Sequence, residues 1–390
     1  MKVRLGIERF LAHPPKWASG ARLGLVCNQA SVDGRFRHAA TLVRERFGGQ
    51  LKCLFSPQHG LWGEKQDNMV ESADCHDAAS GLPVFSLYGK RRRPTAAQFA
   101  LADWILLDLQ DVGCRVYTFA STMACLMEEA AKAGVGIAVL DRPNPIGGVV
   151  VEGPLLKDDC RSFVGVAPIP MRHGLTMGEL ARFIKDCQGL RDLRLEVVTM
   201  AGWRRHMHWP ECGLGWAMPS PNMPTFDTAL VYPGQVALEG TNLSEGRGTT
   251  RPFELCGAPY INPFLLAERL GTHGLPGVVF RPLYFEPTFH KWSGQSCGGL
   301  DIRPVNPKTF RSFTTTLALL REVLALWPKD FAWRQPPYEY ETERLPIDVI
   351  LGDTALRAGL EAGSPLEQIE SSWRRELQSF LRRRRACLLY

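Results

Sequence analysis

The chain has 390 residues, which is too long for a single small hydrophobic core, so we expect two domains. Its composition, 45% hydrophobic and 22% charged, is that of an ordinary soluble globular protein. The net charge of +6 is modest for this length, comes partly from the arginines at 382–385, and accompanies no nucleic-acid-binding signature, so we expect no nucleic-acid partner.

The eleven cysteines form no CxxC pair, and most of them lie inside apolar runs. This usage is typical of reduced, buried thiols and argues against a disulfide framework or a zinc site, so we expect neither metal nor cofactor. No segment has the ~20 consecutive apolar residues that a membrane span needs. Because the N-terminus also lacks the pattern of an export signal, we expect a cytoplasmic protein that does not contact the membrane.

The first 155 residues alternate short apolar runs with helical patterns. This alternation predicts an α/β fold with a parallel sheet covered on both faces, because parallel strands are buried on both sides. Helices are expected near 38–47 and over 118–134, the second closed by Gly134. Strands are expected at 21–29, 51–60, 82–89, 103–111 and 134–145.

Beyond residue 156 the pattern loosens, and we place the domain boundary between 150 and 230. A helix is expected over 175–187, with Thr176 as its N-cap and Glu179 at the spacing of a capping box. The proline-rich residues 216–225 predict an irregular connector. Further elements are expected as a strand at 193–200 and helices near 308–327 and 366–385.

Polar side chains follow several of the expected strands. In open α/β sheets ligands bind beyond the carboxyl ends of the strands, so these side chains are candidates for contacts with a ligand. Neither GxGxxG nor GxxxxGK[ST] occurs, and we therefore do not expect a dinucleotide or a nucleoside triphosphate. The candidates of this group are Asn28, His59, Asp111 and Asp141.

The stretch 228–254 begins as an amphipathic run and then becomes almost entirely polar from residue 239 to residue 251. Its glycines would allow backbone to approach a ligand, and its polar side chains supply the directional hydrogen bonds that a sugar or carboxylate needs. The alternative is a solvated loop whose charges pair with one another. The density of both charge signs favours a binding site, with the candidates Glu239, Asn242, Glu245, Arg247 and Arg251.

The sequence has no HExxH or GxSxG motif and no recognisable cysteine–histidine nucleophile. Glycoside hydrolysis needs two carboxylates, about 5–5.5 Å apart for retention and about 6.5–9.5 Å apart for inversion. Four glutamates stand beside glycines or aromatic residues, and spacing does not select a pair among them: Glu64, Glu152, Glu239 and Glu245. Other candidates for substrate contacts, each of which could equally be structural, are Arg115, Tyr117, His173, Asn222 and His290.

Motifs distributed over nearly the whole chain occur in one order. They are GLVCNQASVD, SPQHGLWGEKQDNM, LPVFSLYGKRRRPT, DLQDVGCRVYTF, LDRPNPIGG, VEGPLL, RHGLTMGE, MPSPNMPT, VYPGQVALEGTNLSEGRGTTRPFE, FEPTFHKWSG and the closing LLY. Together they resemble the bacterial family known as DUF1343 or YbbC-like, whose characterised members are exo-β-N-acetylmuramidases of the NamZ type.

The resemblance implies a Rossmann-like parallel-sheet domain over 1–155, extending at most to about 230, and a smaller α+β domain over 230–390. It places the active site in the cleft between them. It also implies release of N-acetylmuramic acid from the non-reducing end of peptidoglycan fragments, in cell-wall turnover or recycling, without metal or nucleotide. A peptidoglycan-derived sugar is the partner expected.

One motif departs from the family pattern. Many relatives carry PEHG where this chain has Gln58 in PQHG, and an amide cannot donate a catalytic proton. The hypothesis is that Glu64 or Glu152 is the general acid, and that Glu239 or Glu245 activates water or stabilises the oxocarbenium-like state. The lactyl carboxylate of muramic acid would then be bound by one of two arginines, Arg247 or Arg251.

Two other functions remain open at this point. One is a carbohydrate hydrolase of different specificity, such as a deacetylase, although no metal-ligand spacing is visible. The other is a sugar-binding module that has lost catalysis, for which Gln58 is the main evidence.

Overall fold

The computed structural model describes residues 2–67 and 69–390. Its N-terminal half is built on a seven-stranded sheet with the order β3-β4-β2-β1-β5-β6-β9. All neighbouring strands are parallel except β3 and β4, which confirms the expected α/β class. The strands are β1 Leu23–Val26, β2 Leu51–Ser56, β3 Cys75–His76, β4 Pro83–Ser86, β5 Trp104–Leu107, β6 Gly136–Leu140 and β9 Leu195–Val198.

Helices cover both faces of this sheet, as the continuous apolar strands require. Ile105 and Leu107 of β5 pack with the helices α4 and α5, whereas Leu106 points to the other face and packs with α1 and α2. The helices of this half are α1 Gly6–Ala12, α2 Ala39–Phe47, α3 Ala96–Phe99, α4 Phe119–Ala133 and α5 Met177–Cys187.

The local signals at two of these helices are confirmed. α4 ends at Gly134, whose φ of 68° is the left-handed conformation that closes many helices. α5 begins with the expected capping box, in which the Thr176 hydroxyl accepts from Glu179 N and the Glu179 carboxylate accepts from Thr176 N. Residues 216–225 form the irregular connector that their prolines predict.

The C-terminal half is smaller and contains an antiparallel sheet of order β10-β12-β11, packed against helices. The expected helices near 308–327 and 366–385 are confirmed as α8 and α11. Its strands are β10 Leu255–Ala258, β11 Val278–Phe285 and β12 Cys297–Pro304, and its helices are α6 Phe226–Gln235, α7 Pro263–Gly271, α8 Ser312–Leu326, α9 Pro346–Leu351, α10 Thr354–Glu361 and α11 Leu366–Arg384.

Shorter elements connect the two halves. A two-stranded sheet pairs β7 Glu152–Leu155 with β8 Pro170–Arg172. The described residues also form six short 3-10 turns: Lys16–Ala18, Gly48–Gln50, Asp158–Cys160, Trp209–Cys212, η5 Val236–Gly240 and Arg385–Cys387. Within the described part of the chain, no helix combines the length and the apolar content that crossing a bilayer requires.

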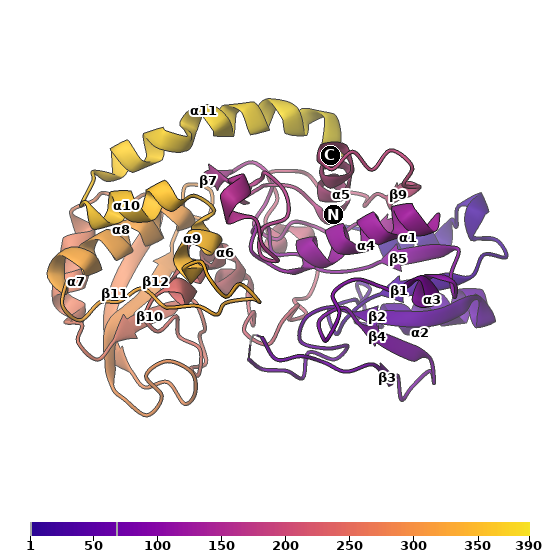
Figure 1. Ribbon diagram of the computed structural model, residues 1–390, viewed down its shortest axis with the longest axis horizontal. Helices are drawn as coiled ribbons and strands as arrows, with labels where there is room; N and C mark the ends of the chain where they lie inside the picture. The colour runs from indigo at the N-terminus through magenta and orange to yellow at the C-terminus, as the bar shows by residue number, and fades with distance from the viewer. Residues whose placement is uncertain (1, 68) are drawn as a thin grey trace.

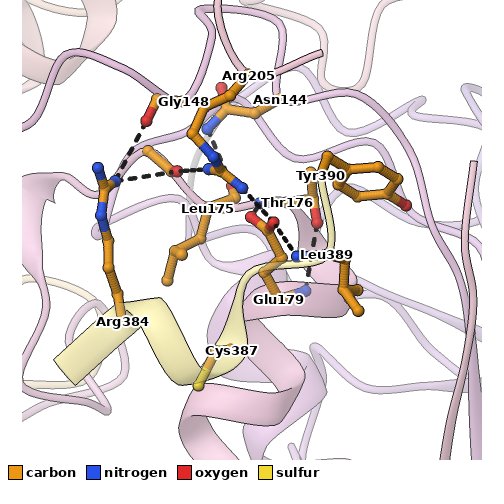
Figure 2. Close-up of polar contacts among 12 residues, drawn as sticks. Asn144, Gly148, Leu175, Thr176, Glu179, Arg205, Arg384, Cys387, Leu389 and Tyr390 are labelled. Atoms are coloured by element: carbon orange, nitrogen blue, oxygen red, sulfur yellow. Dashed lines mark hydrogen bonds and ion pairs between the residues drawn. The ribbon is translucent and has the colours of Figure 1, made fainter. Parts of the chain in front are cut away.

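The last helix, α11, runs along one side of the molecule from the C-terminal half to the N-terminal half (Figure 1). Its Trp373 packs against Phe313 of α8, and its Phe380 packs against Phe183 of α5. The residues that follow it are fixed to the N-terminal half, where Leu389 N donates to the Glu179 carboxylate at 2.9 Å (Figure 2). The helix therefore acts as a strap between the two halves.

Candidate functional site

A buried pocket lies where the two halves meet, and residues far apart in the chain line it. The segment after β2, the segment before α4 and the connector around 220–223 form its N-terminal side. That side contributes Gln58, His59, Tyr117, Thr118 and Asn222. The C-terminal side contributes Tyr232, Glu239, Arg247, Tyr338 and Glu339.

Two polar residues that follow the end of β2, Gln58 and His59, line the pocket. β2 is an inner strand of the parallel sheet, and the two residues follow its carboxyl end at the pocket between the halves. The turn that follows it places His59 at φ 73° and Gly60 at φ 87°, a reversal that ends the strand abruptly. His59, one of the polar residues expected after a strand, therefore lines the pocket.

His59 is a neutral imidazole. Burial, helped by the nearby Arg247 cation, lowers the pKa of His59 to about 4. Its Nδ1 lies 2.7 Å from the Lys65 carbonyl oxygen, which can only accept, so Nδ1 carries the proton. Nε2 is then an acceptor rather than a donor.

Glu239 is the first of two buried glutamates in the pocket. It belongs to η5, the turn that continues from α6, and the residue is only 3% exposed. Arg247 Nη2 donates to its Oε1 at 2.6 Å, and the Tyr338 hydroxyl donates to its Oε2 at 2.7 Å. A cation and a phenol thus fix this carboxylate in one orientation.

Arg247 lies between Glu239 and a second layer of charges. Its Nε is 3.2 Å from Glu245, whose carboxylate also contacts Lys291 at 2.9 Å and His290 at 3.3 Å. Burial acts to raise the pKa of Glu245, but Lys291, His290 and Arg247 lower it to about 2. Glu245 and His290 therefore lie behind Arg247 and outside the pocket lining. Arg247 Nη1 is buried and has no hydrogen-bond partner among the described residues.

The second glutamate in the pocket is Glu339, which the sequence analysis missed. Gln58 Nε2 donates to its Oε1 at 3.1 Å, and the Tyr88 hydroxyl donates to its Oε2 at 2.6 Å. The Thr118 hydroxyl in turn donates to Gln58 Oε1 at 2.6 Å. The signal that could have pointed to Glu339 is a carboxylate between two tyrosines in PPYEYE.

Two of the four carboxylates expected from sequence lie elsewhere. Glu64 is exposed, with its carboxylate beside Gly60 outside the pocket lining. Glu152 is buried but forms an ion pair with Arg172 at 3.0 Å and accepts from Phe313 N at 3.0 Å. It therefore joins β7 and β8 to the first turn of α8, where a helix favours a negative charge.

Polar side chains after the other strands form hydrogen bonds within the loops of the N-terminal half. Asn28 donates to the Pro219 carbonyl at 2.9 Å. Asp111 accepts from Gly113 N at 2.6 Å and lies 3.5 Å from His173, whose Nδ1 accepts from Leu175 N. These side chains satisfy backbone groups, as buried polar residues in tight loops commonly do.

Four further candidates lie outside the pocket lining. Arg115 donates to the carbonyls of 154, 169, 350 and 351, and so ties the two halves together. Asp141 accepts from Thr176, from Gly178 N and from the Tyr390 hydroxyl. Asn242 donates to the Asp330 carbonyl, and Arg251 forms an ion pair with Glu254. In contrast, Tyr117 and Asn222 do line the pocket, and Asn222 is held by Gln66.

The glycines of the stretch 239–251 approach backbone rather than a ligand. A Cβ on Gly246 would lie 2.7 Å from the Leu255 carbonyl oxygen, and one on Gly248 would lie 2.6 Å from that of Phe289. A Cβ on Gly240 would lie 2.7 Å from Ile347 Cα. The charges of this stretch pair with one another, as in the alternative of a loop with internal ion pairs, while Glu239 and Arg247 also line the pocket.

Among the described side chains, no group of three or more histidine, cysteine, aspartate or glutamate residues is positioned to hold a metal ion. The chemistry that the pocket offers is that of two carboxylates, one arginine and several phenols.

Known proteins resemble this chain over its whole length. Family models described as the N-terminal and C-terminal parts of exo-β-N-acetylmuramidase NamZ match residues 23–227 and 230–390. The peptidoglycan β-N-acetylmuramidase NamZ of Bacillus subtilis is 39% identical over 389 residues, covering 100% of this chain and 92% of that protein.

Solved structures agree with this match. A DUF1343 family protein of Bacteroides fragilis superposes with a TM-score of 0.90 at 32% identity, covering 100% of this chain and 99% of the other. A second protein of that family from the same organism gives a TM-score of 0.77 at 26% identity, with the same coverage. The chain therefore belongs to the NamZ family of exo-β-N-acetylmuramidases, as its motifs implied, and is a glycoside hydrolase.

Proposed function

We propose that this protein removes N-acetylmuramic acid from the non-reducing end of peptidoglycan fragments, and that the pocket between its halves is the active site. The observation that carries the proposal is Glu239, a buried carboxylate in the pocket that Arg247 and Tyr338 hold in one orientation. Family membership supports the reaction, and the pocket supplies a fixed negative charge of the kind that glycoside hydrolysis needs.

Glu239 is the carboxylate that faces the anomeric carbon. The transition state of glycoside hydrolysis carries positive charge at that carbon, and an oriented anion stabilises it without reorganising during the reaction. Arg247 and Tyr338 each hold one oxygen of this carboxylate and so fix its orientation. Glu245 contributes indirectly, because it balances the charge of Arg247 from behind.

Arg247 binds the lactyl carboxylate that distinguishes muramic acid from glucosamine. Its Nη1 is buried in the pocket wall and keeps a donor available in the described structure, whereas Arg251 lies outside the lining and is paired with Glu254. A guanidinium donor and a carboxylate form a charge-assisted hydrogen bond, which is roughly twice as strong as a neutral one.

The first test compares a chromogenic β-N-acetylmuramide with the matching β-N-acetylglucosaminide. We expect release from the muramide and little or none from the glucosaminide. Equal release from both would indicate a hexosaminidase of broader specificity. Binding of N-acetylmuramic acid without release from either substrate would support the sugar-binding alternative instead.

The second test separates the two arginines by binding, which does not depend on chemistry. Arg247→Lys is expected to weaken binding of N-acetylmuramic acid by about tenfold or more, since a charge-assisted hydrogen bond contributes about 1.5–3 kcal/mol. Its weak binding of N-acetylglucosamine should change little. Arg251→Lys is the matched control and should bind both sugars as the unmodified protein does. Equal losses on both sugars in Arg247→Lys would rule out the lactyl contact.

A further inference from the structure

We propose that Glu339 is the general acid of this pocket, and that Gln58 and Tyr88 position its carboxyl group. The proposal rests on the exo-muramidase function above and deepens it by naming the proton donor. Glu339 comes from the C-terminal half, whereas both of its positioning partners come from the N-terminal half.

The hydrogen bonds around Glu339 have a defined direction. The Thr118 hydroxyl donates to Gln58 Oε1, so the other end of that amide, Nε2, faces Glu339 and donates to it. The Tyr88 hydroxyl donates to the second oxygen. Glu339 is therefore held at both oxygens, with its side chain 4% exposed and at the pocket wall.

The two pocket glutamates have different electrostatic partners. Glu239 contacts the Arg247 guanidinium, but the ion pairs of the described residues include none with Glu339, whose direct partners are an amide and a phenol. Two carboxylates in one pocket, one paired with a cation and the other with neutral groups, are suited to different roles. The glutamate without a contacting cation is the one suited to carry a proton.

The other charges around Glu339 favour the same assignment. Burial raises the pKa of Glu339 and the Glu239 carboxylate raises it further, while the hydrogen bonds from Tyr88 and Gln58 and the Arg92 cation oppose the shift. Arg92 does not contact the carboxylate but stacks on the Tyr340 ring. Among the described residues, the pocket and its wall also contain His59, which is neutral, and the phenols Tyr117, Tyr232, Tyr338 and Tyr340.

The backbone at Glu339 is also unusual. Tyr338 and Glu341 exchange two hydrogen bonds of 2.9 Å, and the two residues between them have φ values of 45° and 70°. Such a turn normally takes glycine or asparagine at these positions. Here Glu339 and Tyr340 occupy them, and both side chains reach into the N-terminal half. Strain of this kind is typical of functional sites.

In the proposed step the Glu339 carboxyl group gives its proton to the glycosidic oxygen as the bond from that oxygen to the anomeric carbon breaks. The electron pair of the broken bond stays on the oxygen, and the remaining fragment leaves as a neutral alcohol. Water then supplies the hydroxyl group to the anomeric carbon, and its remaining proton restores the Glu339 carboxyl group. One water molecule is consumed in the cycle.

The test uses Glu339→Gln with two substrates that differ in leaving group. The sugar alkoxide of a disaccharide is a poor leaving group and needs the proton. The nitrophenolate of a nitrophenyl muramide leaves readily without it. We expect kcat on the disaccharide to fall about 10²–10⁴-fold, with a much smaller loss on the nitrophenyl substrate. Equal losses on both substrates, or none on either, would overturn the assignment of Glu339.

Two further variants serve as comparisons. Glu239→Gln should lose activity on both substrates alike. Glu64→Gln, which changes the exposed carboxylate outside the pocket, should retain the activity of the unmodified protein. If Glu64→Gln and not Glu339→Gln shows the dependence on leaving group, Glu64 is the acid and the proposal is wrong.

The positioning residues are tested through the pH profile, which a purely structural role would not move. Gln58→Glu places a second carboxyl group beside Glu339, and Tyr88→Phe removes a hydrogen bond that favours its charged form. Both changes raise the pKa of the acid, so activity should persist to higher pH, by about one unit or more for Gln58→Glu. An unchanged pH profile of activity in both variants would show that Gln58 and Tyr88 do not position Glu339.

The two proposals fail in different ways. An unmodified protein that is inactive on both substrates would overturn the exo-muramidase function and, with it, the assignment of Glu339. An active unmodified protein whose Glu339→Gln variant is equally active would overturn only the assignment.

Discussion

Three buried glutamates differ in the side chains that contact them, and these contacts suit each glutamate to a different role. Glu152 contacts Arg172 and a helix N-terminus outside the pocket. Glu239 faces the pocket with its charge balanced by Arg247, and Glu339 faces it with neutral partners. Burial alone therefore does not indicate function, but the partners of a buried carboxylate do.

Glu152 should prove structural when it is replaced. Glu152→Gln leaves the Arg172 guanidinium buried without its counter-charge, which typically costs about 3–5 kcal/mol of unfolding free energy. Urea unfolding should show this loss, while kcat of the protein that remains folded should stay near that of the unmodified chain. A large fall in kcat with unchanged stability would return Glu152 to the catalytic candidates.

Asp141 should make stability depend on pH. Burial raises the pKa of Asp141 from 3.8 to about 6, against the opposing hydrogen bonds from Gly178 N, Thr176 and Tyr390. A raised folded-state pKa stabilises the fold fully below pH 3.8, and this stabilisation is lost as the pH rises through about 6. The unmodified protein should therefore lose about 3 kcal/mol relative to Asp141→Asn between these limits. Parallel urea titrations that show no change in this difference would contradict the prediction.

At the scale of elements, α11 and the residues after it connect the two halves. The C-terminal residues contact the α5 region through Leu389 and Glu179, and Arg384 donates to the Gly148 carbonyl at 3.2 Å (Figure 2). Tyr390 completes the attachment, because its hydroxyl donates to Asp141 and accepts from Met200 N, each at 2.8 Å. This attachment joins the same two halves whose residues line the pocket.

Tyr390→Phe should therefore lower stability without touching the chemistry. It leaves Met200 N without its partner, at a cost of about 1–3 kcal/mol, and removes one of the two hydrogen bonds to Asp141 Oδ2, which still accepts from Thr176. Thermal unfolding should show a clearly lower Tm. Tyr284→Phe is the matched control, because Tyr284 is 62% exposed, and its Tm should not change. Equal Tm values for the two variants would show that the Tyr390 hydroxyl contributes little.

At the scale of the whole molecule, the burial of the cysteines shows how closely the chain is packed. All eleven are free, and Cys75 is the exposed one, while Cys187 is half-buried and the others are buried. Burial also raises the pKa of the buried thiols such as Cys53 and Cys114, both to about 12, which suppresses the reactive thiolate.

A thiol reagent at about pH 8.5 should modify Cys75 faster than the other thiols of the native protein because Cys75 is exposed, even though partial burial and nearby carboxylates also raise its pKa. The remaining thiols should react slowly until urea exposes them. Cys75→Ser should abolish the fast phase. Several fast thiols in that variant would show that the buried cysteines become accessible through local opening of the fold.

Much of the architecture could be predicted from the sequence. The apolar runs at 21–29 and 103–111 became the central strands β1 and β5, and the Thr176 capping box and Gly134 fixed the ends of two helices. These features depend on local periodicity and on hydrogen bonds between near neighbours, which a sequence displays directly. The motifs that mark the family are also local, and they implied its fold and activity.

The composition of the pocket was decided only by the tertiary structure. Gln58 and Glu339 are 281 positions apart, and Glu239 and Tyr338 are 99 apart, so no local pattern relates them. Equally, Glu152 and Arg251 look like site residues in sequence, and only folding reveals the cations and carboxylates that pair with them. The sequence determined which strands and helices form, because those follow from contacts along the chain. Which carboxylates meet, and with what charge beside them, follows from contacts between the two halves.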